Sequence, residues 1–296
     1  MLEFHKINGY QEKRAALRPH LVRTILVDDC IDKGADFNAG GARYYWSVVN
    51  VAGLVNVIDS LFALKHLVFD TGQYTAGGFM DALMSQDAGF LADIGGAPRF
   101  GDGNGEADLF AGKFAGRVFD FFELMNPLLG GKFLPASIQF TTYADAGKNI
   151  GPTPDGRAAG APLADSIAPA RNFAAVPARN MAAGPAYSTA AAGPTAMLSS
   201  AARLPQYKAL GTPVLNLRLL KSAVINALKP LILGYFSQGG MHAQISCYSR
   251  EDLEAAMAHP ETHNDLIVRI GGYSEYFSRL SGDLKRSVLE RCEYSV

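Results

Sequence analysis

Apolar residues recur at helical spacing in several stretches of the chain. The clearest stretch covers residues 45–67, where the apolar positions include Val48, Val51, Leu54, Val55, Ile58 and Leu61. This spacing predicts a long buried helix. We also predict a helix over residues 14–30, where the apolar positions have mixed spacing, and two more over 78–94 and 106–125. A helix over 219–236 is interrupted at Pro230, and a closing helix covers about 283–292.

Other segments have the composition of β-strands. Residues 133–143, 213–218, 241–247 and 266–270 are short runs rich in β-branched, aromatic and other apolar residues. Between the second and third strands lies the helix over 219–236, and Ser249 and Asp252 form a capping box that opens a further short helix after the third. Because strands and helices alternate, we predict an α/β fold with a parallel sheet.

Loop composition divides the chain. Residues 38–43 are a Gly-rich turn, and residues 147–162 are a loop rich in Gly and Pro. Residues 164–202 are dominated by Ala with little periodicity, which predicts a long irregular connection and the best internal boundary.

Composition and charge exclude several classes of function. The 296 residues carry 27 basic and 28 acidic side chains, so the chain has no strong electrostatic signature for binding nucleic acid or an anionic membrane. Polar residues interrupt the most apolar stretch, 44–69, and the N-terminus lacks an apolar core of the signal-peptide type. The three cysteines, Cys30, Cys247 and Cys292, are isolated, which favours a reducing cytoplasm.

One segment resembles a metal site without matching it. Residues 102–108 read Asp-Gly-Asn-Gly-Glu-Ala-Asp, but the sixth and twelfth positions of a calcium loop fall on Ala107 and Lys113 instead of Gly and Glu. We therefore expect a solvated turn there and no metal in this chain.

The segment that carries chemistry is residues 269–277, Arg-Ile-Gly-Gly-Tyr-Ser-Glu-Tyr-Phe. Alone, Gly-Gly after a strand indicates only a turn. Two further segments change this interpretation, namely Gly-Pro-Thr-Pro-Asp-Gly-Arg at 151–157, continuing to Asp165, and Asp-Phe-Asn-Ala-Gly-Gly-Ala-Arg-Tyr at 36–44, followed by Asp59-Ser-Leu61 and Lys65. Residues 239–244 and 214–217 belong to the same set of segments. In this order, the segments resemble the glycyl radical enzymes of the pyruvate formate-lyase and diol dehydratase superfamily.

The resemblance implies that Gly272 stores a radical on its α-carbon. A side chain would crowd the planar radical centre, and glycine has none. We expect the radical to be buried from oxygen in a tight loop flanked by Ile270, Tyr273 and Phe277. Recognition by the activating enzyme would involve Arg269, Gly271, Tyr273 and Ser274. That enzyme is of the radical S-adenosylmethionine type and carries the iron–sulfur cluster, so no cofactor is expected in this chain.

The resemblance also implies a fold and a division of the chain. The chain would be the C-terminal portion of a ten-stranded α/β barrel with a central glycyl radical loop. Residues 1–165 would belong to the barrel, 166–195 to an Ala-rich connection and 196–296 to the glycine radical domain. The family's reactions on small molecules include acyl transfer, diol dehydration, C–N cleavage and decarboxylation, and the loop sequence favours the dehydratase branch.

A complete family member also has a catalytic cysteine in a separate loop, to which the radical passes. None of Cys30, Cys247 and Cys292 stands in such a setting. One interpretation is that the three matches mislead and this is an ordinary α/β protein. Three others follow from the resemblance. The chain is the radical-bearing part of a split enzyme whose partner supplies the N-terminal half, a spare part that repairs a damaged enzyme, or an inactive fragment that binds a partner. A half barrel would leave open sheet edges and an apolar face.

Overall fold

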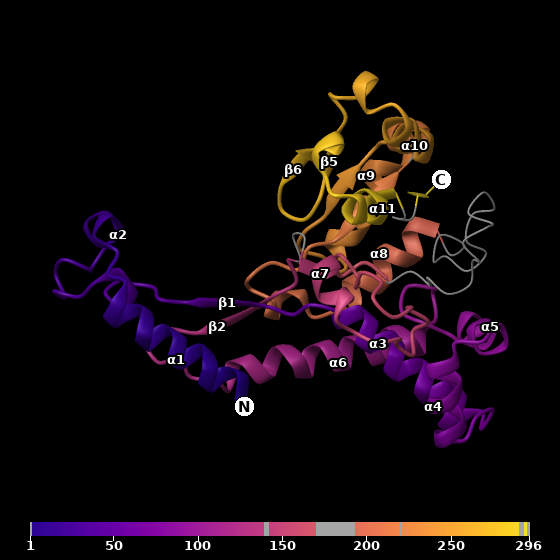
Figure 1. Ribbon diagram of the computed structural model, residues 1–296, viewed down its shortest axis with the longest axis horizontal. Coiled ribbons are helices and arrows are strands. Elements are labelled where there is room, and N and C mark those ends of the chain that lie inside the picture. Colours follow the sequence, from indigo (N-terminus) through magenta and orange to yellow (C-terminus); the bar gives the residue numbers. More distant parts are fainter. Residues whose placement is uncertain (1, 139–141, 170–192, 220, 290–292, 295–296) are drawn as a thin grey trace.

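In the computed structural model, the chain is described for residues 2–138, 142–169, 193–219, 221–289 and 293–294. Figure 1 shows three regions: an extended arm at the N-terminal end, a central body, and an upper lobe that contains the C-terminal strands and helices. The helices are α1 Leu2–Leu17, α2 Leu21–Leu26, α3 Leu54–Leu64, α4 Ala76–Ser85, α5 Ala88–Gly96, α6 Gly105–Glu123, α7 Thr142–Lys148, α8 Gly193–Arg203, α9 Lys221–Ser237, α10 Arg250–Ala258 and α11 Gly282–Leu289. The strands are β1 Ser47–Asn50, β2 Phe133–Ala136, β3 Asn216–Leu219, β4 Gln244–Ser246, β5 Ile267–Arg269, β6 Ser274–Tyr276 and β7 Glu293–Tyr294.

Parallel pairing dominates the strands of the body. β1 pairs with β2 from Ser47 opposite Phe133, and β3 pairs with both β4 and β7 in parallel. A parallel bridge between Ser137 and Pro213 places the end of β2 beside the segment that leads into β3. The predicted parallel α/β arrangement is confirmed for these strands.

The main core lies between β3 and four helices. Its buried residues come from α3, α6, α8, α9 and β3, and include Ile58, Phe119, Met197, Leu217 and Tyr235. A separate cluster of buried hydrophobic residues lies between α4 and α5, and another lies under β5, β6, α10 and α11. The last cluster matters here because it supports the segment that carries Gly272.

Several predicted elements have other boundaries in the structure. The helix predicted over 14–30 is two helices, α1 and α2, because Pro19 cannot continue a helix and disfavours helical geometry in the residue before it. The helix predicted over 78–94 is divided into α4 and α5 at Gln86, which adopts a φ of +47°. Asp87 then caps α5 by accepting a hydrogen bond from the backbone of Phe90.

The helix predicted over 45–67 was wrong in its first part. Residues 47–50 form β1, and α3 begins only after Gly53, which has a φ of +74°. A continuous apolar run does not distinguish a buried helix from a strand followed by a helix. Residues 193–203, expected to be irregular, form α8. The rest of the Ala-rich connection lies mostly outside the described residues.

Other predictions were confirmed. The helix predicted over 106–125 is α6, and Asn104 caps it by accepting from the backbone of Glu106 and Ala107. The capping box of Ser249 and Asp252 opens α10 with both reciprocal hydrogen bonds. The closing helix is α11, although residues 290–292 lie outside the described part.

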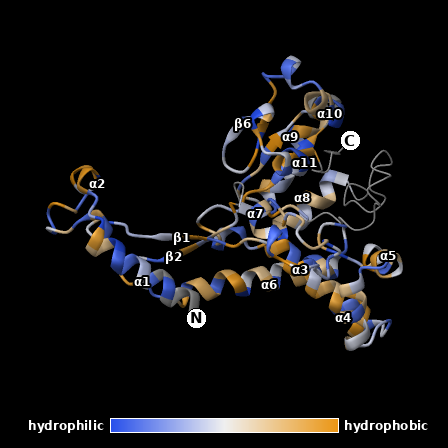
Figure 2. Ribbon diagram, viewed as in Figure 1, coloured by the Kyte–Doolittle hydropathy of each residue, from blue (hydrophilic) through white to orange (hydrophobic). Residues whose placement is uncertain are grey.

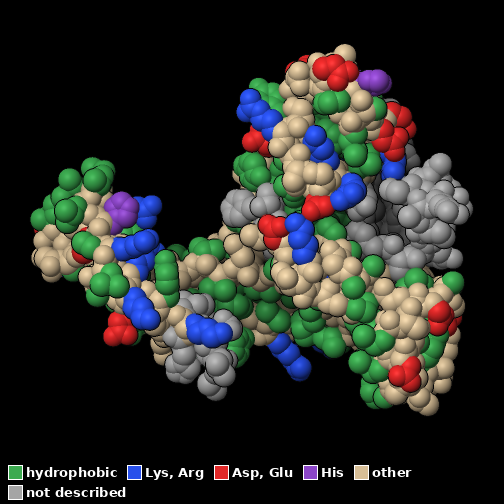
Figure 3. Space-filling view, viewed as in Figure 1, with side chains coloured by type: hydrophobic (Ala, Val, Ile, Leu, Met, Phe, Trp, Pro, Cys, Tyr) green, Lys and Arg blue, Asp and Glu red, His purple; other side chains and the backbone are tan. Residues whose placement is uncertain are grey.

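The N-terminal arm carries an uncovered apolar end. The exposed fractions of Leu21, Val22, Ile25 and Leu26 lie between 63% and 75%. In Figure 2 the ribbon of α2 carries the colour of hydrophobic residues, and Figure 3 shows hydrophobic side chains gathered at this end of the arm. A contiguous apolar surface of this kind is typical of a protein–protein interface.

Candidate functional site

Gly272 lies in the turn of an antiparallel hairpin formed by β5 and β6. Arg269 faces Ser274 across the hairpin, and Ile267 faces Tyr276. The backbone N–H of Ile270 donates to the carbonyl of Tyr273 at 3.0 Å and closes the turn. The two glycines are therefore the central residues of a tight turn.

The backbone conformation explains part of the need for glycine at position 272. Gly272 has a φ of +82°, in the region that side chains with a Cβ rarely adopt. Positive φ at the second central residue is also what a type II turn requires. A structural role for Gly272 is therefore established, independently of any chemistry.

The hairpin packs on one face only. Val268, Ile270 and Phe277 are at most 1% exposed and lie in a cluster with residues of α10 and α11. Tyr273 is half-buried and Gly271 is buried, whereas Gly272 and Ser274 are exposed. The expectation that residues 270, 273 and 277 flank the loop is confirmed, but the expectation that the radical position is buried is wrong for this chain by itself.

Two side chains of the sheet hold the hairpin. The Oε1 of Gln244 on β4 accepts from Nε of Arg269 at 2.7 Å, and Nη1 of Arg269 donates to the hydroxyl of Ser274 at 3.2 Å. The amide of Asn216 on β3 donates to the carbonyl of Ile270 at 3.5 Å and to Oδ2 of Asp165 at 3.1 Å. Sequence reasoning gave no role to Asn216 or Gln244. The signal was their position in two of the segments that resemble the family.

The electrostatics of this region favour a neutral histidine. Burial lowers the pKa of His242, and the positive charge of Arg269 lowers it further. Both effects favour the neutral form of His242.

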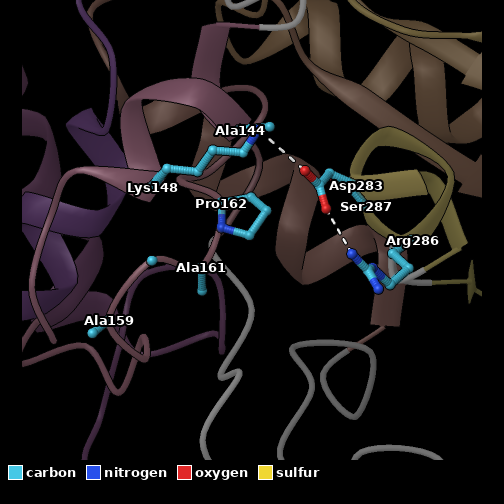
Figure 4. A pocket seen from close by; sticks show the side chains of 9 residues that line it. Ala144, Lys148, Ala159, Ala161, Pro162, Asp283, Arg286 and Ser287 are labelled. Carbon is cyan, nitrogen blue, oxygen red and sulfur yellow. Dashed lines mark hydrogen bonds and ion pairs between the residues drawn. The ribbon is translucent and has the colours of Figure 1, made fainter. Parts of the chain in front are cut away.

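The helix that follows the hairpin, α11, is fixed to the body. The hydroxyl of Tyr143 on α7 donates to that of Ser287 at 2.9 Å, and Lys148 pairs with Asp283 at 3.1 Å. Figure 4 shows the cavity of about 370 Å³ beside this contact, with Asp283 between Lys148 and Arg286. The hydrogen bond from Arg286 lowers the pKa of Asp283 most, and Lys148 adds to the effect, so the carboxylate stays ionised.

The segment 151–157 has a structural role of its own. Arg157 is fully buried and donates to the carbonyls of Ala158, Ala161, Ile150 and Gly151. Its Nε also donates to the hydroxyl of Thr153 at 3.2 Å, so these five bonds fold the loop around a single guanidinium group, which has five N–H donors.

Asp155 ties the same loop to α3. Its Oδ2 accepts from Asn56 at 2.6 Å, and its backbone N–H donates to Ser60 at 3.2 Å. Nearby Asp59 is 2% exposed and accepts from the backbone of Phe100. Burial raises the pKa of Asp59 to about 7, although Arg99 opposes the shift.

The segment 36–44 lies in the arm and not at the hairpin. Asp36 accepts hydrogen bonds from the hydroxyl of Thr24 at 2.6 Å and from the backbone of His20 at 2.8 Å. Figure 1 places this region at the far end of the molecule from β5 and β6. The three resembling segments are therefore not brought together in one site.

The described residues bear on three other kinds of site: a thiol site, a metal centre and a membrane span. Cys30 is fully buried in the arm, and Cys247 is half-buried after β4. Within the described ranges, no three His, Cys, Asp or Glu side chains gather as metal ligands. None of the helices in those ranges has both the length and the apolar character needed to cross a bilayer.

Comparison with known proteins gives two family matches. The family described as Pyruvate formate lyase-like matches residues 3–147, and the family described as Glycine radical matches residues 180–278, which include the hairpin. The chain is 31% identical to the probable dehydratase YbiW of Escherichia coli over 92% of this chain and 34% of that protein. It is 28% identical to trans-4-hydroxy-L-proline dehydratase of Clostridioides difficile over 93% of this chain and 34% of that protein.

A solved structure shares the fold over nearly the whole chain. The glycerol-bound B12-independent glycerol dehydratase of Clostridium butyricum aligns with a TM-score of 0.87 at 30% identity, over 98% of this chain and 36% of that one. The chain spans about a third of the length of the curated relatives that it matches. Since the two family matches together take in both the body and the hairpin, the chain belongs to the glycyl radical enzyme superfamily.

Proposed function

We propose that this chain stores a glycyl radical on Gly272 as the radical-bearing part of an anaerobic radical enzyme. The observation that carries the proposal is the placement of Gly272 in an exposed tight turn on a buried support, within the segment that matches the Glycine radical family. An activating enzyme of the radical S-adenosylmethionine type would reach this turn directly. The carbon-centred radical that it generates takes one hydrogen atom from the α-carbon of Gly272, and the unpaired electron stays on that carbon.

The catalytic thiol would come from another polypeptide segment. Neither described cysteine stands in the sequence setting of the family's thiol loop: Cys30 is buried in the arm, and Cys247 directly follows β4. The relatives are about three times as long as this chain, so the segment that corresponds to their thiol loop would lie outside these 296 residues. We propose that the parallel strands of the body, completed by that half, form the ten-stranded barrel with the hairpin at its centre.

Exposure of Gly272 supports the same arrangement. A carbon radical left open to solvent would meet dissolved oxygen, so the stored radical needs a cover that this chain by itself does not supply. The partner that brings the thiol would also cover the turn. A cytoplasmic, anaerobic setting fits this requirement.

The substrate would be a small hydroxylated molecule. The relatives named above include dehydratases of hydroxyproline and glycerol. We therefore place the chain with the dehydratases and lyases of the superfamily in preference to its acyl transferases.

A second candidate function is that of a spare part, which docks its radical onto a damaged full-length enzyme. Exposure of Gly272 on the isolated chain favours this alternative as well. An inactive fragment is the third interpretation, and the experiment below separates it from the other two.

The experiment is cleavage by oxygen. The chain is incubated without oxygen with its activating enzyme, S-adenosylmethionine and a reductant, then exposed briefly to air and measured by mass spectrometry. We expect two fragments that divide at Gly272, and none when S-adenosylmethionine is omitted. An intact chain after this treatment, even with the N-terminal half present, would identify an inactive fragment.

A further inference from the structure

The turn that carries Gly272 depends on contacts from outside the hairpin. β5 and β6 have three residues each, and a two-stranded hairpin is at best marginally stable alone. The buried cluster holds Val268, Ile270 and Phe277, which lie below the turn. Groups that hold the hairpin at the base of its turn therefore decide where Gly272 lies.

Two neighbouring side chains, from β3 and β4, hold the hairpin at this point. Asn216 and Gln244 are register partners on the parallel strands β3 and β4. Asn216 reaches the carbonyl of Ile270, and Gln244 reaches the guanidinium of Arg269. Arg269 also bonds Ser274 on the opposite strand, so one continuous chain of hydrogen bonds runs from β4 across the base of the turn.

The contact of Gln244 is the stronger of the two. Its donor is charged, the distance is 2.7 Å, and Gln244 is only 6% exposed. The contact of Asn216 is 3.5 Å long, at the limit for a hydrogen bond. Charge-assisted hydrogen bonds are roughly twice as strong as neutral ones, so Gln244 contributes more than Asn216 to holding the turn.

We propose that Gln244 is a positioning residue for Gly272. By holding Arg269, it keeps the turn against β4 and limits how often the turn opens. This proposal rests on the proposed function, because a fixed turn matters to the chemistry only if Gly272 carries the radical. Its consequence is that Gln244 fixes how the turn sits beneath its cover, and so affects the lifetime of the radical, without touching the radical carbon.

Hydrogen–deuterium exchange of the full chain tests the positioning directly. In Gln244→Leu, we expect the amides of residues 267–276 to exchange at least about tenfold faster than in the parent. Gln244→Glu keeps an acceptor for Arg269 and should restore the parent rate. Ser200→Ala is the matched control, since it removes a buried hydrogen bond of 2.7 Å to Asp108 between α8 and α6 and does not contact the hairpin.

The results decide the proposal in either direction. The proposal is overturned if the hairpin amides of Gln244→Leu exchange at a rate within about twofold of the parent rate. It is also overturned if Ser200→Ala accelerates their exchange equally. A failure of Gln244→Glu to restore protection would overturn it as well.

A second readout links positioning to the radical. In activated samples, the paramagnetic signal should decay faster in Gln244→Leu by about the same factor as exchange, and at the parent rate in Gln244→Glu. Faster exchange with unchanged decay would refute the role in radical storage. If the parent itself forms no radical, the proposed function fails, and the exchange result still decides whether Gln244 holds the turn.

Discussion

Substitution of Gly272 has two separable effects, one on the turn and one on the chemistry. In Gly272→Ala, the alanine must adopt a φ near +82°, which costs an L-residue roughly 1–2 kcal/mol. Gly272→Asn should cost less, because asparagine tolerates the left-handed region better. Both variants should lose cleavage by oxygen at position 272.

A second glycine of the chain provides the control. Gly130 has a φ of +80°, and a Cβ there would meet no atom within 4 Å. Gly130→Ala should therefore lose about the same 1–2 kcal/mol as Gly272→Ala, while radical formation is retained.

The assay is urea unfolding of each variant, followed by activation and mass spectrometry. A loss below about 0.3 kcal/mol in Gly272→Ala would contradict the positive φ of the turn. Loss of the radical in Gly130→Ala would show that lower stability alone explains the result for Gly272. Cleavage that persists in Gly272→Ala would refute Gly272 as the radical site.

Three further predictions concern the support of the site. Arg157→Lys keeps the charge but not the planar set of donors, and should lower the free energy of unfolding by about 2–4 kcal/mol, measured in urea. Asp59, with a pKa raised to about 7, binds its proton more tightly in the folded than in the unfolded state, so its contribution to stability is present at low pH and lost as pH rises from about 4 to 7. Asp59→Asn keeps an acceptor for Phe100 and should remove this dependence, so the variant should gain stability relative to the parent over that range. The measurement is the free energy of unfolding against pH. If the two curves ran parallel, the raised pKa of Asp59 would be contradicted. Gly147→Ala would place a Cβ 2.1 Å from the carbonyl of Ala161 and should cost about 2 kcal/mol or more, whereas Gly151→Ala, with open space around it, should cost little when both are compared by thermal unfolding.

The sequence was informative where a signal is local. The helix α6 could be predicted because its apolar spacing is regular and Asn104 caps it. The capping box of Ser249 and the Gly-Gly turn are likewise local patterns. By contrast, β1 was hidden in one apolar run with α3, and only the positive φ of Gly53 separates them in the structure.

The support of the hairpin could not be predicted because it depends on tertiary contacts. Arg269 and Gln244 are 25 positions apart, and Asn216 and Ile270 are 54 positions apart. Hydropathy and spacing contain no information about which polar side chains meet across such distances. The exposure of Gly272 is a property of the same kind, since it depends on what covers the hairpin.

Electron paramagnetic resonance of the activated chain tests the central claim most directly. One sample is made with ordinary glycine and a second with glycine deuterated at the α-carbon. We expect a doublet from the single remaining α-hydrogen of Gly272 in the first sample, its collapse in the second, and no signal in Gly272→Asn. No signal from the parent, even with an added N-terminal half, or a signal that deuteration leaves unchanged, would contradict the account.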